Sequence, residues 1–284
     1  MSYLQAIILG IIQGITELFP VSSLGHSVIL PSIFGWHINQ HDPFFLIFLV
    51  ATHTATALVL LFYFREDWMN IAIGMWRSLR ARQIKSSNPY GKLGWLLVTA
   101  TIPAGILGLL LEDKLKNLFA APHLITQVLT VNGFLLLGAD FLRHKSQRIV
   151  REGEQSDLRI ATLSWWASIK IGIMQCLALI PGFSRTGSTI TGGLLSGLAY
   201  EDAARFSFLL ATPIILAASL LKLPELLMDH SADFSLGPII AGSIAAAIFA
   251  YLSVRFLLHY FETKKLMPFG MYCIVIGAIA IAFI

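Results

Sequence analysis

Apolar residues fill most of this chain, in stretches long enough to cross a lipid bilayer. Six of these stretches match the ~20 residues that a membrane-spanning helix needs. They lie at about Pro43–Phe64, Leu93–Leu111, Leu124–Leu142, Phe206–Leu221, Leu236–Leu258 and Met267–Ile284. Lipid offers no hydrogen bonds to the backbone, so each span is expected to be a helix. The pattern predicts an all-α polytopic membrane protein.

Two further apolar segments are interrupted by polar residues next to a proline. The first covers about residues 3–34 and is broken by Pro20-Val21-Ser22-Ser23-Leu24-Gly25-His26. The second covers about residues 163–198 and is broken by Pro181-Gly182-Phe183-Ser184-Arg185-Thr186-Gly187-Ser188-Thr189. Proline ends a helix because it lacks an N–H and clashes with the preceding turn. Each arm is too short to span, so each segment is predicted to be a re-entrant helical hairpin with its polar tip in a protein cavity.

The order of a hairpin followed by three spans occurs twice. The first repeat covers residues 1–142 and the second 161–284, with a charged linker at 143–160. Gln13 and Pro20-Val21-Ser22-Ser23 resemble Gln175 and Pro181-Gly182-Phe183-Ser184, and Phe48-Leu49-Val50-Ala51-Thr52 resembles Phe208-Leu209-Leu210-Ala211-Thr212. Both matches share an offset of about 160 residues, which indicates one repeat. Three spans is an odd number, so the halves are predicted to form an inverted repeat.

The placement of Lys and Arg predicts the orientation in the membrane. Basic residues concentrate in the loop Arg65–Lys92, in the linker, and at Lys264 and Lys265. Such loops are cytoplasmic by the positive-inside rule. This places both chain ends outside, with the first hairpin entering from the outer side and the second from the cytoplasm. The two polar tips are then expected to meet near the middle of the membrane.

The composition supports this class and excludes others. The chain of 284 residues is 56% hydrophobic and 13% charged, whereas soluble domains carry about 25% charged residues. The basic residues flank spans, so nucleic acid is not an expected partner. Cys176 and Cys273 lie in apolar segments and are predicted to pack rather than to form a disulfide or bind metal. The first apolar stretch leads directly into polar residues, which is unlike a removable signal peptide.

The second tip, residues 181–189, has the residue types of a phosphate site. Arg185 presents a planar fork that matches two phosphate oxygens, and Gly182 allows the backbone to approach a ligand. A new helix N-terminus and hydroxyl groups add donors. The hydroxyl residues are Ser184, Thr186, Ser188 and Thr189. The structural alternative is a Ser/Thr/Gly helix contact with an arginine that reaches the surface.

The first tip, residues 17–26, supplies complementary groups. Gln13 and Glu17 are four residues apart and share a helix face. A carboxylate in a membrane needs a partner, for which Arg185 is the candidate. Glu17 is predicted to bind a divalent cation or to act as a base, and Ser23 to be a nucleophile or a phosphate donor.

Each of these assignments has a structural alternative. Glu17 and Arg185 can form only an ion pair. Ser22 or Ser23 can cap the second arm of the hairpin, and His26 can make a hydrogen bond between packed helices.

Other ionisable residues lie in or near the spans. His53 lies within the first full span and is predicted to line the site. Asp140, Glu201, Asp202 and Arg205 lie near the ends of spans and are predicted to be interfacial.

With these residues assembled, the chain resembles the bacterial undecaprenyl-diphosphate phosphatase family, also called the bacitracin-resistance protein family. The resemblance covers essentially the whole chain. It is strongest at Gln13-Gly14-Ile15-Thr16-Glu17-Leu18-Phe19-Pro20-Val21-Ser22-Ser23-Leu24-Gly25-His26 and Pro181-Gly182-Phe183-Ser184-Arg185-Thr186-Gly187-Ser188-Thr189-Ile190-Thr191-Gly192-Gly193. It implies an inner-membrane phosphoanhydride hydrolase that removes the terminal phosphate of undecaprenyl diphosphate. The monophosphate carrier then returns to peptidoglycan synthesis, and the activity confers bacitracin resistance.

The resemblance also implies roles for individual residues. Glu17, Ser23 and His26 match the family's acidic, serine and histidine positions. Ser184, Arg185 and Thr189 match its second, phosphate-handling motif. The family is associated with a divalent cation, expected here to be Mg²⁺ or Ca²⁺. Gln13 stands where the family has Glu or Gln, and its carbonyl oxygen can still coordinate a cation.

The resulting hypothesis places the isoprenoid tail in a lipid-facing cleft between the hairpins. Arg185 and the hydroxyls of the second tip hold the diphosphate, which enters from the outer side. Either Ser23 or a water held by Glu17 and His26 attacks the terminal phosphorus, and the sequence does not choose between them.

Two other functions compete with this one. Inverted repeats with broken helices are typical of secondary transporters, so a transporter or flippase for an anionic lipid or solute is the main alternative. A phosphatase of the phosphatidic-acid type is disfavoured because its Lys-and-Arg motif is not evident. The sequence leaves open the chain-length preference and the oligomeric state, a homodimer included.

Overall fold

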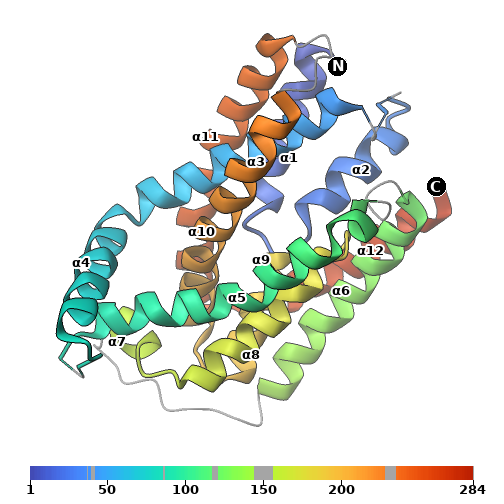
Figure 1. Cartoon of the computed structure of the whole chain (residues 1–284). Coiled ribbons are helices and arrows are strands. Elements are labelled where there is room, and N and C mark those ends of the chain that lie inside the picture. Colours follow the sequence, from blue (N-terminus) through green and yellow to red (C-terminus); the bar gives the residue numbers. More distant parts are fainter. Residues whose placement is uncertain are drawn as a thin grey trace.

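The computed structural model describes residues 1–36, 38–39, 42–85, 87–116, 121–143, 156–227 and 235–283. Every regular element in these residues is a helix, as Figure 1 shows. The helices before the linker are α1 (Tyr3–Thr16), α2 (Ser23–Ile33), α3 (Pro43–Tyr63), α4 (Arg65–Ala81), α5 (Pro89–Lys116) and α6 (Pro122–Arg143). Those after it are α7 (Ser156–Ile160), α8 (Trp165–Gln175), the 3₁₀ turn η1 (Cys176–Leu179), α9 (Arg185–Leu195), α10 (Tyr200–Leu227), α11 (Leu236–Thr263) and α12 (Met267–Phe283). The prediction of an all-α fold is confirmed.

Five of these helices, α3, α5, α6, α10 and α11, are long and apolar enough to cross a membrane. The sixth predicted span corresponds to α12, which has 17 residues in the described part of the chain. The two interrupted segments form pairs of short helices, α1 with α2 and α8 with α9. The chain is therefore a multi-pass membrane protein. Most of the predicted charged linker, residues 144–155, lies outside the described residues.

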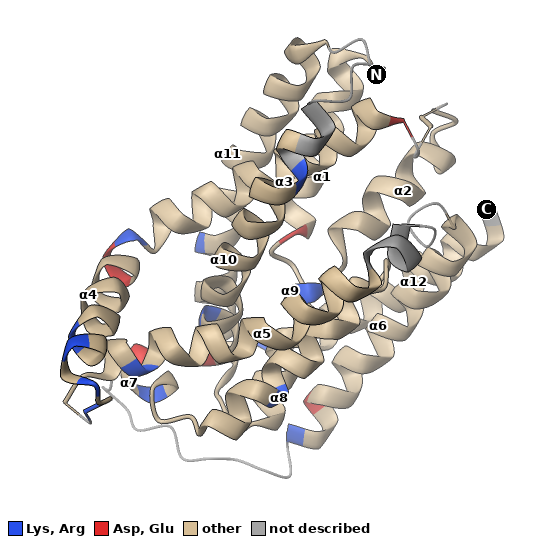
Figure 2. Cartoon of the chain, in the orientation of Figure 1, with Lys and Arg blue, Asp and Glu red and all other residues tan. Residues whose placement is uncertain are grey.

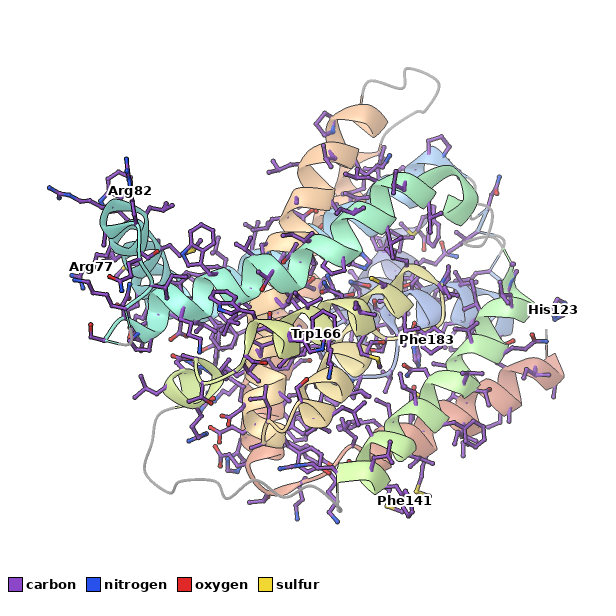
Figure 3. The ribbon with its side chains drawn as sticks, turned by 60° about the horizontal axis from the view of Figure 1, so that its bottom comes forward. Arg77, Arg82, His123, Phe141, Trp166 and Phe183 are labelled. Atoms are coloured by element: carbon purple, nitrogen blue, oxygen red, sulfur yellow. The ribbon has the colours of Figure 1, made fainter. Side chains whose placement is uncertain are left out.

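The segment Arg65–Lys92, treated above as a loop, contains helix α4. Its buried face consists of Ile71, Gly74 and Ser78, and it packs against α5. Two hydrogen bonds fix this contact, from Asn88 Nδ2 to Gly74 O (2.8 Å) and from Trp95 Nε1 to Ser78 Oγ (2.8 Å). The arginines that suggested a loop lie on the outer side of α4, where Figure 3 shows Arg77 and Arg82 projecting away from the chain.

Small residues let the helices around the first hairpin approach closely. Gly10 and Gly14 of α1 face Gly242 and Ala246 of α11. A Cβ atom at either glycine of α1 would collide with the backbone of α11. Helices in lipid associate mainly through such close packing, so this contact holds α1 in place.

The two short helix pairs meet in the middle of the molecule. In Figure 1, α1, α3 and α11 lie together in the upper part, and α5, α6, α8 and α12 lie in the lower part. Helix α9 packs against α6, α8 and α10, and α10 also packs against α3. The turn after α1 and the start of α9 therefore lie where the two parts of the chain join.

Among the described residues, charged side chains gather at the end formed by α4 and α7 (Figure 2). An ion cluster joins α4, α7 and α10 there. Arg205 Nε lies 2.6 Å from Asp157 Oδ1, and Arg205 Nη2 lies 2.8 Å from Asp67 Oδ1. Arg159 Nη2 lies 2.7 Å from Asp202 Oδ1. Arg205 and Asp202, expected to be interfacial, thus belong to this cluster and not to the polar tips.

Glu201 and Asp140 are also bound outside the tips. Glu201 pairs with Arg159 at 3.0 Å. Asp140 accepts hydrogen bonds from the Tyr200 hydroxyl (2.7 Å) and from the backbone N–H groups of Leu266 (3.2 Å) and Met267 (2.7 Å). Its carboxylate therefore stabilises the start of α12, where backbone donors have no partner within the helix.

The ion cluster makes the stability of the fold sensitive to pH. Burial is the main influence on Asp67 and raises its pKa to about 6; Asp157 acts in the same direction and Arg205 opposes it. The folded state therefore binds a proton on Asp67 more tightly than the unfolded state, whose Asp67 has the ordinary pKa of 3.8. The stability gained from this proton is complete below pH 3.8 and is lost as the pH rises through about 6. We expect Asp67→Asn to reduce the fall in Tm between about pH 4 and pH 7.

The measurement is thermal unfolding in detergent across this pH range. Glu66→Gln is the matched control, because it makes the same kind of change in the adjacent residue, whose side chain is 80% exposed. Equal pH dependence of Tm in wild type and Asp67→Asn would contradict the prediction.

Candidate active site

The first tip is a tight turn between α1 and α2. Helix α1 ends at Thr16, and Pro20 lies in the turn. Ser22 has a positive φ of 67°, and its side chain accepts a hydrogen bond from the backbone N–H of Gly25 (3.3 Å). Ser22 therefore caps α2. Capping was the structural alternative given above for Ser22 or Ser23. Ser23 is left free of the capping role.

The second tip is capped in the same way. Ser184 accepts a hydrogen bond from the backbone N–H of Gly187 (3.0 Å) at the start of α9. Gly182 has a φ of +104°, and a Cβ atom there would meet Ile125 and Val128 of α6. The positive φ and the contact with α6 therefore both require glycine at position 182. The sequence had suggested a different reason, the close approach of a ligand.

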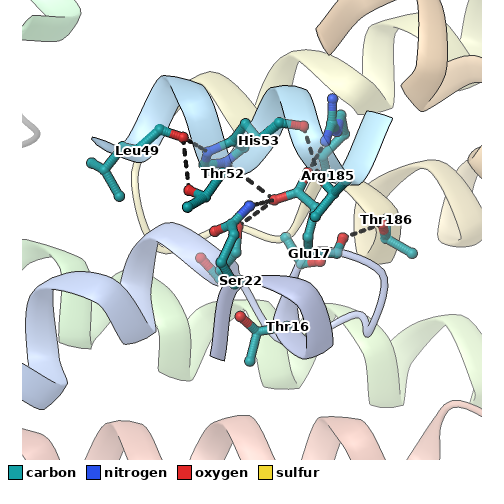
Figure 4. Close-up of polar contacts among 12 residues, drawn as sticks. Thr16, Glu17, Ser22, Leu49, Thr52, His53, Arg185 and Thr186 are labelled. Atoms are coloured by element: carbon teal, nitrogen blue, oxygen red, sulfur yellow. Dashed lines mark hydrogen bonds and ion pairs between the residues drawn. The ribbon is translucent and has the colours of Figure 1, made fainter. Parts of the chain in front are cut away.

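The structure brings the two tips into direct contact. Arg185 Nη2 forms a close ion pair with Glu17 Oε1, so the expected partner of Glu17 is present. Thr186 Oγ1 donates a hydrogen bond to the backbone oxygen of Glu17 (3.0 Å). Figure 4 shows Glu17 between Arg185 and His53. The residues that meet here are 168 positions apart in the chain.

Glu17 is the centre of a buried polar cluster. Its second oxygen, Oε2, accepts hydrogen bonds from Gln13 Nε2 (3.0 Å) and Ser23 Oγ (2.5 Å). The same oxygen lies 3.2 Å from His53 Nε2. The Glu17 side chain is only 4% exposed. Four of the residues predicted from the sequence, in addition to Glu17, therefore surround one carboxylate.

His53 lies between a backbone carbonyl of its own helix and Glu17. Its Nδ1 lies 2.7 Å from the backbone oxygen of Leu49, and its Nε2 faces Glu17. A ring nitrogen that carries a proton donates to the oxygen it faces, and the ring is positively charged when both nitrogens carry one. Arg185 places a positive charge beside the negative charge of Glu17, and His53 adds a second when its ring is protonated. An excess of buried positive charge favours the binding of an anion.

Several buried polar atoms around this cluster have no hydrogen-bond partner among the described residues. They include Gln13 Oε1, Arg185 Nε and Ser188 Oγ. Unpaired buried polar atoms are destabilising and often mark a ligand or water site. Thr189 differs, because its hydroxyl is already engaged with Ser207 Oγ (2.5 Å) and with backbone oxygens of α9.

His26 lies apart from this cluster. Its Nδ1 is 2.7 Å from Ser22 O, and its Nε2 is 2.8 Å from the hydroxyl of Tyr272 on α12. The two rings are also stacked, with centroids 5.7 Å apart. A carbonyl accepts and a hydroxyl can donate, so a neutral ring satisfies both contacts. These contacts correspond to the packing alternative given above for His26.

Two residues that contact the tips or a predicted site residue were not predicted from the sequence. Tyr272 binds His26, and Asn132 of α6 contacts both tips. Asn132 had a usable signal, because it is an amide inside an otherwise apolar span. Tyr272 had none, since tyrosine is ordinary near the ends of membrane helices.

The fold and the site together define a class of protein. It is a multi-pass membrane protein in which two helix pairs meet at a buried cluster of a carboxylate, an arginine and a histidine. The family model described as bacitracin resistance protein BacA matches residues 6–279, and the chain belongs to this family. The resemblance inferred from the two motifs is confirmed.

Curated relatives align along the whole chain. Undecaprenyl-diphosphatase 2 of Chromobacterium violaceum is 44% identical over 286 residues, covering 100% of this chain and 99% of the relative. Undecaprenyl-diphosphatase of Mycolicibacterium paratuberculosis is 43% identical over 301 residues, covering 100% and 98%. Undecaprenyl-diphosphatase 2 of Burkholderia thailandensis is 46% identical over 278 residues, covering 98% and 95%.

Proposed function

We propose that this protein hydrolyses undecaprenyl diphosphate to undecaprenyl phosphate and inorganic phosphate. The reaction recycles the lipid carrier for cell-wall synthesis and confers bacitracin resistance. Membership of the family and the names of the relatives support this function. The structural observation that carries it is the contact of Arg185 and His53 with Glu17, with Ser23 on the same carboxylate.

The geometry gives each residue of the cluster a role. Arg185, whose Nε has no partner among the described residues, and His53 bind phosphate oxygens and stabilise the charge of the transition state. Ser184, Thr186 and Ser188 lie at the start of α9, and a helix N-terminus favours an anion. The Ser188 hydroxyl has no partner among the described residues, whereas the hydroxyls of Ser184 and Thr186 donate to backbone oxygens of the first tip. When a phosphate takes over Arg185, Glu17 loses its strongest partner and becomes a better base.

Ser23 is positioned to transfer its proton to Glu17, since the two oxygens are 2.5 Å apart. Its Oγ attacks the terminal phosphorus, the bond to the bridging oxygen breaks, and undecaprenyl phosphate leaves. Water then hydrolyses the phosphoserine and releases inorganic phosphate. In the alternative, Glu17 activates a water that attacks the phosphorus in one step.

Replacing Ser23 with alanine distinguishes these routes. If Ser23 is the nucleophile, we expect Ser23→Ala to lower kcat by at least about 10²-fold, and rapid quenching of wild type to give phosphoserine at this position. The measurements are phosphate release and mass spectrometry. Ser27→Ala is the matched control, because Ser27 is a buried serine of the same helix whose hydroxyl has no partner among the described residues. Full turnover by Ser23→Ala would exclude the serine route.

A divalent cation, Mg²⁺ or Ca²⁺, fits this site through two residues. Gln13 turns its amide nitrogen to Glu17, which leaves Gln13 Oε1 buried without a partner among the described residues. An unpaired carbonyl oxygen and one carboxylate, together with substrate phosphates, are a donor set that Mg²⁺ commonly uses. No group of three His, Cys, Asp or Glu side chains suited to a metal occurs in the described part of the chain. When bound, the cation would neutralise phosphate charge.

The proposed location is the bacterial inner membrane, with both termini outside and the site open to the outer side. Both chain ends lie away from the end formed by α4 and α7, where basic residues of the described part of the chain gather, and this supports the orientation (Figures 1 and 2). The proposed arrangement of the two halves is an inverted repeat. In each half a pair of short helices is followed by three apolar helices, α3, α5 and α6 in the first and α10, α11 and α12 in the second, with α4 as an additional helix of the first half, and this recurrence supports it.

The test is phosphate release from undecaprenyl diphosphate by purified protein in detergent, where transport across a bilayer does not occur. We expect release in the presence of Mg²⁺ or Ca²⁺. A folded protein that releases no phosphate with any divalent cation would exclude hydrolysis and favour the transporter.

A further inference from the structure

Asn132 connects the two tips through both ends of its amide. It lies in α6, near the middle of the helix, and its side chain is fully buried. Asn132 Nδ2 donates to the backbone oxygen of Pro20 (3.1 Å), and the backbone N–H of Ser184 donates to Asn132 Oδ1 (3.1 Å). Because a carbonyl only accepts and an N–H only donates, these partners fix the orientation of the amide.

The two backbone atoms that Asn132 binds are close to the reacting groups in sequence. Pro20 lies between Glu17 and Ser23, and Ser184 directly precedes Arg185. The tips come from separate helix pairs and are far apart along the chain. Their separation therefore depends on how the helices pack. Besides the Arg185–Glu17 ion pair, two hydrogen bonds join the tips directly, from Thr186 to Glu17 O and a longer one from Ser184 Oγ to Phe19 O (3.5 Å). Asn132 differs because it ties both tips to a third helix.

We propose that Asn132 is a positioning residue, which sets the distance between Arg185 on the second tip and Glu17 and Ser23 on the first. This inference rests on the proposed function. A displacement of about 1 Å between reacting groups lowers a rate by about 10²-fold. The binding of a long apolar tail does not depend on this distance. Loss of Asn132 therefore reduces kcat more than it changes KM.

The alternative is that Asn132 only fills space between α6 and α12 and satisfies the hydrogen bonds of nearby backbone groups. Its Nδ2 also lies 3.4 Å from Cys273 Sγ, the titratable side chain that touches it from α12. A packing role predicts that stability changes without a selective loss of kcat. Two substitutions of similar volume separate these roles.

Asn132→Leu removes both hydrogen bonds at similar side-chain volume. We expect kcat for phosphate release to fall by about 10²-fold, with a change in KM below about threefold. Asn132→Asp tests the donor and acceptor pattern itself. The protonated carboxyl can donate to Pro20 O and accept from Ser184 N–H, whereas the carboxylate cannot donate and repels Pro20 O. The activity of Asn132→Asp relative to wild type is therefore expected to rise towards the acid end of a series from about pH 5 to pH 9, because burial favours the neutral carboxyl.

Thr126→Val is the matched control. Thr126 is a fully buried polar residue of the same helix, and among the described residues its hydroxyl donates to the backbone of α6, at His123 O (2.8 Å). We expect it to keep the wild-type kcat. If Asn132→Leu fails to fold, the pH series on a single preparation of Asn132→Asp still supplies the test.

The inference is overturned if Asn132→Leu keeps kcat within about threefold of wild type. It is also overturned if Asn132→Asp is no more active than Asn132→Leu at any pH. Either result in the presence of an active wild type leaves the proposed function intact. Absence of phosphate release by wild type itself would instead contradict the proposed function.

Discussion

Replacing Arg185 with alanine is expected to reduce kcat/KM for phosphate release by about 10³- to 10⁵-fold, the range found when a catalytic arginine is lost from phosphoryl-transfer enzymes. Arg185 is the guanidinium that contacts Glu17, and its Nε has no partner among the described residues. It therefore has donors available for a phosphate. Arg185→Lys keeps the charge but loses the planar fork, and we expect it to recover only a small part of the activity.

The control for this prediction is Arg77→Ala. Arg77 is an arginine of α4 that points away from the chain, far from both tips (Figure 3). Phosphate release in detergent, with initial rates over a range of substrate concentrations, gives kcat and KM for each variant. Wild-type kcat/KM in Arg185→Ala would mean that the second tip does not bind the reacting phosphate.

Replacing Glu17 with glutamine is expected to have the second largest effect, a loss of about 10²- to 10⁴-fold in kcat. The amide cannot accept the proton of Ser23 and leaves Arg185 and His53 without a negative partner. Breaking a buried ion pair on one side also costs about 3–5 kcal/mol of stability. Both kcat and the free energy of unfolding should therefore fall.

The double variant Glu17→Gln with Arg185→Gln separates catalysis from a purely structural ion pair. It removes both charges, so we expect much of the lost stability to return while activity stays as low as in the worse single variant. Thermal unfolding and phosphate release measured on the same preparations provide the comparison. Recovery of activity in the double variant would show that the Glu17–Arg185 pair is structural.

The phosphatase proposal and the transporter alternative use the same structural feature. Short helices that end inside the molecule expose backbone donors to an anion in both classes of protein. What favours hydrolysis in this chain is Ser23, which lies on the carboxylate that faces the arginine. A transporter that only binds an anion needs the positive charge but has no use for a hydroxyl paired with a base.

The amino-acid sequence determined the class of the fold and most of the residues at the site. Long apolar stretches require spanning helices, because lipid leaves the backbone no other partners. Pro20 and Pro181 indicated where the two interrupted helices break. Glu17 and Arg185 could be predicted to pair, because a charge buried in a membrane needs an opposite charge beside it. Helix α4 was not predicted, because many of its residues are charged or polar and its buried face consists of only Ile71, Gly74 and Ser78.

Only the tertiary structure decided which side chains reach the carboxylate. His53 and His26 both looked like site residues, yet His53 contacts Glu17 while His26 turns to Tyr272. That choice depends on how α2, α3 and α12 pack, which no local pattern encodes. The same holds for Asn132, whose two partners lie 112 and 52 residues away. Sequence patterns report the faces and ends of helices, whereas contacts between distant segments follow from the packing of whole helices.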